Sequence, residues 1–448
     1  MNKKPTNIFL YILAAGFLLW HLLPLFAIGK AVAPDEKTNA ELATNTMCFG
    51  GDLDVPTYGD PLQDPLITTL NSRSSLIANS RNLQTIQLNP YPTSTDTAGS
   101  SSWQADNYGT NTAKLEVKNG SILAVTMRDF VEGDAKWRTQ EIAVQPGESL
   151  RFASDYRTNV AVTSNVTYTF RDGSTEYVTL SRLSASEDWR QQATEIIVPN
   201  NVVAVRFSVI LDDNGWLETK DYSISRYTTP GFSRGIVSFT FDDGWESIYQ
   251  QGLPLFEKYD INTTQFIVAD YDRNEAYMSP EQIRQLQKLG HDIGSHSYSH
   301  ADHEALQDQD LAREVAGSRA VLNYKFGGTN NFAAPFGRYN EEVNTAVKRC
   351  YQSHRTTDTG FNAPGYNRYT VRVQNVEVDT TPEQIREWAE FARDNNLWLV
   401  LVYHQVEDGG VYSVDTKALE NHLKAVKETG VHTATYEEAL IETYPQGR

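Results

Sequence analysis

Cysteine and basic residues are both scarce in this chain of 448 residues. Only Cys48 and Cys350 are present, so at most one disulfide can form; we expect two free thiols, with a single disulfide as the alternative. Lysine and arginine number 39 against 57 acidic residues, which gives a net charge of −18. This charge argues against a nucleic-acid partner and against broad electrostatic binding of anionic polymers.

The first 33 residues have the composition of a membrane segment. Two lysines precede residues 8–28, an almost wholly apolar run that is long enough to cross a bilayer. The lysines favour a cytoplasmic N-terminus, with the rest of the chain outside. A cleaved signal peptide, giving a secreted protein, is the alternative. Because Pro34 disfavours cleavage after Ala33, we expect residues 1–33 to remain as a single-pass transmembrane anchor in the cell membrane.

Two regions of different character follow the anchor. Residues 34–80 are rich in Asp, Thr, Asn, Pro and Ser, which is typical of an extracellular linker. Residues 81–230 contain short alternating runs separated by turn signals such as Asn119-Gly120 and Asp172-Gly173. The runs cover 114–117, 122–127, 141–144, 150–154, 164–170, 177–180, 194–198 and 204–211. Many short strands at this spacing predict an all-β sandwich.

The sandwich pattern resembles the jelly-roll carbohydrate-binding modules that are often joined to glycan enzymes. Aromatic faces suit the apolar face of a pyranose, so the aromatic side chains of this region are candidates for sugar stacking. For each of them a place in the core is the alternative. They are Trp103, Tyr108, Trp137, Trp189 and Trp216.

Strands and helices alternate in residues 231–448. Strands are predicted at 264–268, 293–295, 331–334, 370–376 and 397–403, and helices at 246–259, 311–325, 341–350, 419–428 and 436–442. Ser279-Pro280 and Thr381-Pro382 are typical of helix starts, each with a capping hydroxyl followed by proline. Repeated βα units of this length predict an α/β fold with a parallel barrel.

Three polar clusters stand out in this region, and two of them follow apolar runs. Residues 235–241 predict a buried strand that delivers Asp242 and Asp243 to its C-terminal end, where α/β enzymes place their chemistry. His296 and His300 lie four residues apart and would share one face if this segment made a helical turn. One Asp and two His, with positions left for water, are the ligand set of a catalytic zinc site. His404 ends a further apolar run.

Taken together, these clusters resemble the polysaccharide deacetylase (NodB-homology) family of carbohydrate esterases over roughly residues 232–446. The matching stretches are Thr240-Phe241-Asp242-Asp243-Gly244, His296-Ser297-x-x-His300, Ala334-Pro335-Phe336-Gly337 and Tyr403-His404. The resemblance implies a distorted, incomplete (β/α) barrel. It also implies that Asp243, His296 and His300 bind one divalent metal ion. We expect Zn²⁺, with Co²⁺, Ni²⁺ or Mn²⁺ as alternatives.

The resemblance also implies roles for the remaining motif residues. Asp242 would be the general base and His404 the general acid. Pro335, Phe336 and Gly337 would bind substrate, with the Phe336 backbone N–H at the oxyanion, and Val402 would line the acetyl pocket.

The chain departs from the family at two motifs. Ala333 stands where well-known members carry an arginine that pairs with the base, and the fourth motif is not evident. Arg355 or Arg372 are candidates to supply the missing guanidinium from another strand. His303 is expected on the solvent side or behind the metal ligands.

We therefore expect an anchored, extracellular, metal-dependent deacetylase of N-acetylated or O-acetylated polysaccharide, with no protein partner indicated. A catalytically silent glycan-binding surface protein and an amide hydrolase for a small non-sugar substrate are the alternatives. The sequence does not choose between chitin-like polymers, peptidoglycan, poly-N-acetylglucosamine and acetylxylan as substrate.

Overall fold

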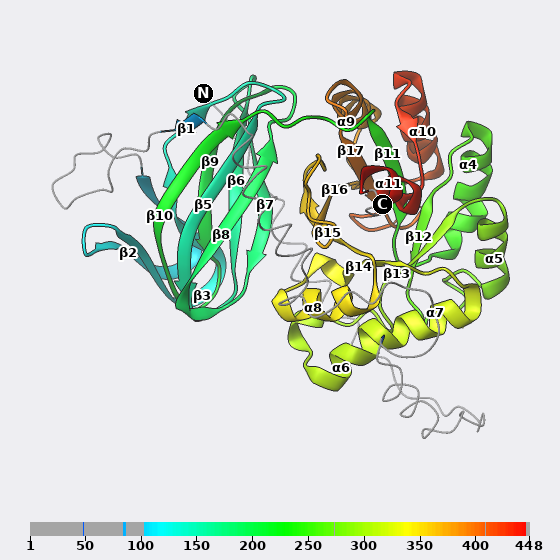
Figure 1. Cartoon of the computed structure of the whole chain (residues 1–448), viewed down its shortest axis with the longest axis horizontal. Helices are drawn as coiled ribbons and strands as arrows, with labels where there is room; N and C mark the ends of the chain where they lie inside the picture. The colour runs from blue at the N-terminus through cyan, green and yellow to red at the C-terminus, as the bar shows by residue number, and fades with distance from the viewer. Residues whose placement is uncertain (1–47, 49–83, 87–102, 273, 408, 445–448) are drawn as a thin grey trace, which may run out of the picture. The chain divides into compact units, whose positions relative to one another are not determined.

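The computed structural model describes residues 48, 84–86, 103–272, 274–407 and 409–444, which form two separate sheets (Figure 1). The predicted anchor 1–33 and, apart from Cys48, the predicted linker 34–80 lie outside these residues. Among the helices that are described, none combines the length and the apolar character needed to cross a membrane.

The first sheet contains ten antiparallel strands, with the central order β7-β6-β9-β3-β10-β5-β8. The strands are β1 (Gln84–Ile86), β2 (Trp103–Lys118), β3 (Ile122–Thr139), β4 (Ile142–Ala143), β5 (Ser149–Thr158), β6 (Val162–Phe170), β7 (Thr175–Leu183), β8 (Ser186–Ile197), β9 (Val202–Leu211) and β10 (Gly215–Tyr227). The start of β3 pairs with β10 and its end pairs with β9. This long strand therefore joins β7-β6-β9 to β10-β5-β8, and both groups of strands contribute to one core. The predicted all-β region is confirmed, but the sequence pattern missed β1, β10, most of β2 and β8, and the greater part of β3.

The second sheet contains eight parallel strands, in the order β12-β13-β14-β15-β16-β17-β11-β18. They are β11 (Ile236–Phe241), β12 (Thr264–Ile267), β13 (Asp292–Ser295), β14 (Asn331–Ala333), β15 (Ser353–Thr359), β16 (Val371–Asn375), β17 (Trp398–Tyr403) and β18 (His432–Thr433). The C-terminal end of β11 also pairs with β12, which closes the sheet into a barrel. The short β18 pairs with the N-terminal end of β11. The predicted (β/α) barrel is confirmed; β15 is the strand that the sequence pattern missed.

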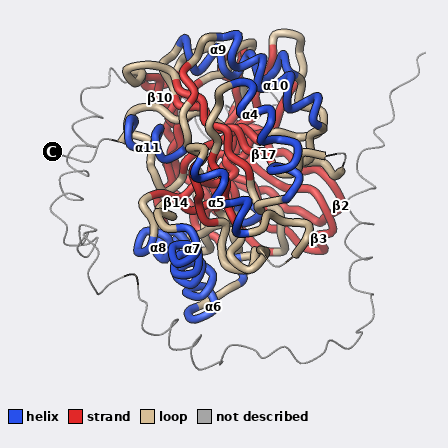
Figure 2. The backbone as a smooth tube through the Cα atoms, turned by 90° about the vertical axis from the view of Figure 1, so that its right-hand side faces the viewer, coloured by secondary structure: helices blue, strands red, loops and turns tan. Residues whose placement is uncertain are grey.

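Helices lie outside the parallel strands (Figure 2). They are η1 (Ile248–Gly252), α4 (Leu253–Tyr259), α5 (Pro280–Lys288), η2 (His303–Ala305), α6 (Asp308–Ala312), η3 (Arg313–Gly317), α7 (Ser318–Phe326), η4 (Pro335–Gly337), α8 (Glu341–Cys350), α9 (Pro382–Asp394), α10 (Thr416–Thr429) and α11 (Tyr436–Thr443), of which η1 and η3 are π-helical turns. The Ser279 and Thr381 hydroxyls cap α5 and α9 as predicted, by accepting from the Gln282 and Gln384 backbone N–H groups.

Alternate residues of the barrel strands enter two different cores. Along β17, Leu399 and Leu401 pack outward against the helices, whereas Val400 and Val402 pack inward with Phe266. Strands buried on both faces are typical of parallel sheets.

The expectation of two free thiols is wrong. Cys48 and Cys350 form a disulfide across a sequence separation of 302 residues, with their Cα atoms 5.2 Å apart. Cys350 ends α8, and Cys48 packs against the same small core beneath this helix. Distance along the chain does not restrict distance in a fold, so the sequence spacing gave no reason to reject the bond.

Candidate active site

Asp242 and Asp243 follow β11 at the C-terminal end of the barrel. The Asp242 backbone N–H still donates to the Tyr403 carbonyl at 2.9 Å, so this residue continues the strand. Asp243 then turns into the left-handed region, with φ 71°, followed by Gly244 at φ 81°. A Cβ on Gly244 would also lie 2.9 Å from Ile267 Cδ1. The turn therefore separates the two carboxylates: Asp242 is buried and Asp243 is half-buried.

His296 and His300 follow β13, but the segment between them makes no helical turn. Ser297 and His300 instead have φ values of 70° and 62°, and the Ser297 hydroxyl accepts from the His300 backbone N–H at 2.9 Å. The conditional helical interpretation is thus wrong, because left-handed residues reverse the chain here. The two rings still lie near each other, with centroids 5.0 Å apart.

Three ligand atoms converge at this point. Asp243, His296 and His300 each place one potential ligand atom within 4.8 Å of the others. The Asp243 Oδ1 atom is 3.5 Å from His296 Nε2 and 3.3 Å from His300 Nε2, and it is buried without a hydrogen-bond partner. The other Asp243 oxygen accepts from Trp245 Nε1 at 2.9 Å, which fixes the carboxylate.

The tautomer and the protonation state of His296 suit a metal ligand. Its Nδ1 lies 2.9 Å from the Ala333 carbonyl oxygen, which can only accept, so the proton sits on Nδ1 and the Nε2 lone pair faces Asp243. Burial lowers the pKa of His296 to about 4, so the ring is neutral at neutral pH. An orphaned carboxylate oxygen facing two imidazole nitrogens fits one divalent ion.

Glu314 holds the segment 296–300, here called the histidine loop, and the sequence did not indicate this role. This carboxylate lies in the π-helical turn η3 and is only 5% exposed. It accepts from the Tyr298 and Ser299 backbone N–H groups at 3.1 and 2.9 Å, and from the Ser299 hydroxyl at 2.6 Å. π-helical turns often occur at functional sites, so η3 points to Glu314. The sequence pattern did not predict this turn.

Replacing Glu314 with alanine is expected to lower the metal affinity of the protein by about 10- to 100-fold, because groups that orient metal ligands typically contribute this much. Titration with Zn²⁺ measures the effect. Glu257→Gln, a change at an exposed residue of α4, is the control and should match the wild type. Equal affinity in the Glu314→Ala protein would show that the loop needs no such support.

Asp242 is paired with an arginine from a strand that the sequence analysis missed. The Nη2 atom of Arg355, a fully buried residue of β15, donates to both Asp242 oxygens at 2.6 Å. Burial alone would raise the pKa of Asp242, but the Arg355 charge, helped by His296 and His404, outweighs it and holds this pKa below its usual range. Asp242 is therefore ionised at neutral pH.

Of the two arginines considered as replacements for the missing guanidinium, the structure places Arg355 at the base. Ala333 and Arg355 are directly paired in the β14–β15 register, so the guanidinium reaches Asp242 from the neighbouring strand. Arg372 instead donates to the Thr359 carbonyl at 3.1 Å.

His404 lies beside Asp242 because β11 and β17 pair along their full length, ending with Phe241 opposite Tyr403. The His404 Nδ1 atom is buried and has no hydrogen-bond partner among the described residues. The Tyr412 ring packs against the imidazole, with centroids 5.3 Å apart. His303, expected on the solvent side or behind the ligands, is fully buried with its ring stacked on Phe332.

The third motif forms the short turn η4. Phe336 has a φ of 55°, is 58% exposed, and places its ring 4.5 Å from that of His300. Gly337 is needed at φ 64°, because a Cβ there would lie 1.7 Å from Thr357 Oγ1. Pro335 and Val402 are buried, the latter inside the barrel. The substrate-binding roles of these four residues stay predictions.

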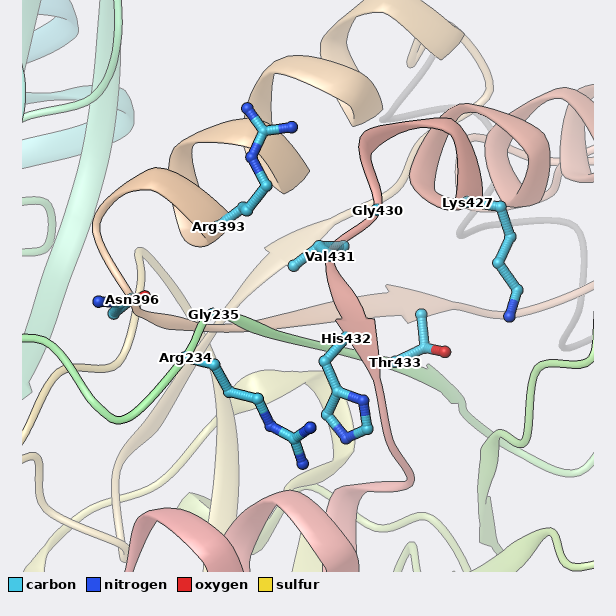
Figure 3. Close-up of a pocket in the computed structure, with 9 residues that line it drawn as sticks. All are labelled: Arg234, Gly235, Arg393, Asn396, Lys427, Gly430, Val431, His432 and Thr433. Atoms are coloured by element: carbon cyan, nitrogen blue, oxygen red, sulfur yellow. The ribbon is translucent and has the colours of Figure 1, made fainter.

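A separate cavity of about 530 Å³ lies at the opposite ends of β11 and β17 (Figure 3). None of the predicted site residues lines it. Its cations already have partners: Arg234 bonds to Glu442, Arg393 to Asp394, and Lys427 to the Asp260 carbonyl. The cavity therefore does not replace the strand-end cluster as the candidate active site.

Comparisons with known proteins agree with this assignment. Residues 230–352 match the family described as Polysaccharide deacetylase. The chain is 32% identical over 154 residues to the "Putative polysaccharide deacetylase YxkH" of Bacillus subtilis, covering 34% of this chain and 55% of that protein. It is 35% identical over 82 residues to a chitin deacetylase of Colletotrichum lindemuthianum, covering 18% of this chain and 33% of that protein. The alignments thus span about half or less of these two relatives.

Among solved structures, the Xyl-CE4 domain of a multidomain xylanase from the hindgut metagenome of Trinervitermes trinervoides aligns at 18% identity. The alignment covers 46% of this chain and 90% of that one, with a TM-score of 0.37.

Proposed function

Residues 230–352 belong to the polysaccharide deacetylase family, whose members are hydrolases of acetylated sugars, and from this premise we propose that the chain is a metal-dependent deacetylase of an extracellular polysaccharide. The observation that carries the proposal is the pairing of an ionised base with a metal-ligand set. Asp242, held by Arg355, adjoins Asp243, which faces His296 and His300. The absence of the family arginine at Ala333 slightly favours the alternative of a catalytically silent glycan-binding protein, whereas the guanidinium that Arg355 supplies to Asp242 supports the deacetylase.

In the proposed reaction, Asp243, His296 and His300 would hold a divalent ion, which would supply Lewis acidity towards water and the acetyl carbonyl. Asp242 accepts a proton from the attacking water while the water oxygen bonds to the acetyl carbon. His404 donates a proton to the sugar nitrogen or oxygen as its bond to the acetyl carbon breaks, giving acetate and the free sugar group. The Phe336 backbone N–H would donate to the carbonyl oxygen as negative charge develops there.

A screen for acetate release tests this function. Acetylated chitooligosaccharide, peptidoglycan, poly-N-acetylglucosamine and acetylxylan are offered to the chain after chelation and after addition of Zn²⁺, Co²⁺, Ni²⁺ or Mn²⁺. We expect release from at least one glycan that is lost on chelation and restored by metal. If no acetate appears with any of them, the silent-binder alternative takes over.

We also propose that the enzyme acts outside the cell, anchored by residues 1–33. The Cys48–Cys350 disulfide supports export, because disulfides persist mainly in oxidising compartments. N-terminal sequencing of the mature protein tests the anchor: a start near Pro34 would mean cleavage and secretion instead.

The antiparallel sheet is proposed to bind glycan weakly. Trp103 and Trp137 are 4% and 8% exposed and belong to its core, so sugar stacking falls to the other aromatic candidates. Trp189 and Trp216 flank the Arg157 guanidinium at 5.0 and 5.8 Å from their ring centroids, and both are half-buried.

Trp189→Ala in the full chain is expected to reduce co-sedimentation with insoluble substrate several-fold, because it removes one ring of this pair. Tyr324→Ala, which changes a tyrosine that is 92% exposed on α7, is the control. Unchanged co-sedimentation would give Trp189 a structural role only.

A further inference from the structure

The chain that follows His404 presents an exposed aromatic ring on a fixed base. Val406 and Val414 are buried and form a β-bridge, and the Val414 N–H donates to the Gln405 carbonyl at 3.1 Å. The Val406 N–H is held by the Ser247 hydroxyl at 3.1 Å. Tyr412, between these anchors, is 54% exposed.

Two exposed valines lie near Tyr412, in the segments that follow β16 and β17. Val411 and Val378 are also exposed, and the Val378 N–H donates to the Val411 carbonyl at 2.7 Å. Three exposed apolar residues are thus neighbours along the backbone, and a contiguous apolar surface of this kind marks binding sites. Of the three, Tyr412 contacts His404, with ring centroids 5.3 Å apart.

A second exposed ring, Phe336, lies on a different side of the mouth. Phe336 follows β14 and packs on the metal-ligand candidate His300, whereas Tyr412 follows β17 and packs on the acid candidate His404. In the closed sheet, β15 and β16 separate β14 from β17. The two rings therefore border the two functional halves of the site.

In the proposed reaction, the metal-ligand side and the His404 side of the site contact different parts of the substrate. The acetyl carbonyl must face the metal ligands, while the leaving group must face the acid that protonates it. In deacetylation of a glycan, the leaving group is the sugar. A ring beside His404 is thus placed to contact the sugar, and the apolar face of a pyranose suits an aromatic surface.

We infer that Tyr412 is a specificity-determining residue that stacks on the pyranose carrying the acetyl group and so selects glycans over simple acetyl esters. The inference rests on the proposed deacetylase function. Tyr412 takes no part in proton transfer in this assignment. Its contribution is to bind and orient the sugar, which lowers KM for glycans.

The test compares two substrates: the acetylated oligosaccharide that the wild type hydrolyses best, and ethyl acetate, which has no ring to stack. The measured quantity is the ratio of kcat/KM values for the two. In Tyr412→Ala this ratio should fall about tenfold or more, mainly through a higher KM for the oligosaccharide. Tyr412→Phe keeps the ring and should keep the ratio within about threefold. Tyr324→Ala, on the surface of α7, should change neither activity.

The outcomes separate the inference from the function on which it rests. If Tyr412→Ala lowers both activities in parallel and leaves the ratio unchanged, the residue only supports His404, and the inference is wrong while the function stands. A ratio that stays at the wild-type value with both activities intact also overturns it. A wild type that hydrolyses neither substrate overturns the deacetylase function itself.

Discussion

The Asp242→Asn protein is expected to turn over acetylated glycan at least about 10²-fold more slowly than the wild type, with its metal content unchanged. Asparagine keeps the shape of the side chain but cannot accept the proton of the attacking water. Asp242 is not one of the three convergent ligand candidates, so metal stoichiometry should be preserved. The measurement pairs kcat on the best substrate with metal analysis of the same preparation.

His404→Ala should show a loss of similar size, because the leaving group would then depart without a proton. Asp310→Asn, at an exposed residue of α6, serves as the matched control. If either active-site variant lost its metal along with its activity, the division between ligands and acid–base residues would be misplaced. If both kept the wild-type rate, the chemistry would have to lie elsewhere in the barrel.

Asp242, Asp243 and His404 could be predicted because they follow strongly apolar runs, whereas His296 and His300 follow the short strand Asp-Ile-Gly-Ser and were found by their spacing. The run before Asp242 is buried at every position, and so is the run before His404. Such runs identify strands, and the C-terminal strand ends of a parallel barrel meet at one place. Asp242, Asp243, His296, His300 and His404 lie at this one end of the barrel, and their individual roles stay predictions.

The residues that support them could not be predicted in the same way. Strand β15 reads Ser-His-Arg-Thr-Thr-Asp-Thr and is largely buried, although it contains no apolar side chain. Without an apolar period, neither this strand nor the register that places Arg355 opposite Ala333 is visible in the sequence. Glu314 was missed for a related reason, because its contacts depend on a π-helical turn and on left-handed residues in the histidine loop.

Arg355→Ala is expected to damage both stability and activity. Removing one partner of a buried ion pair leaves an uncompensated charge, which typically lowers the free energy of unfolding by about 3–5 kcal/mol. Without Arg355, burial would dominate and the pKa of Asp242 would rise. Because a protonated Asp242 cannot act as base, the acid limb of the pH–kcat profile should move to higher pH. Denaturant unfolding and the pH profile measure the two effects.

The register of β14 and β15 offers a sharper test of the same pair. Ala333 is buried, lies directly beside Arg355, and occupies the position where the family carries its arginine. In the wild type, Ala333→Arg would place a second guanidinium in space that Arg355 already fills, so this variant alone should be destabilised and less active.

In the Arg355→Ala background, however, Ala333→Arg should raise kcat at least about tenfold above that of Arg355→Ala alone. It should also return the acid limb of the pH–kcat profile towards its wild-type position. The two arginine positions would then be alternative ways to ionise one base, and the double-mutant cycle would show a large favourable coupling. If the double variant is only as active as Arg355→Ala, or worse, a guanidinium from β14 cannot replace the one from β15. Arg355 would then have to act through contacts other than its charge on Asp242.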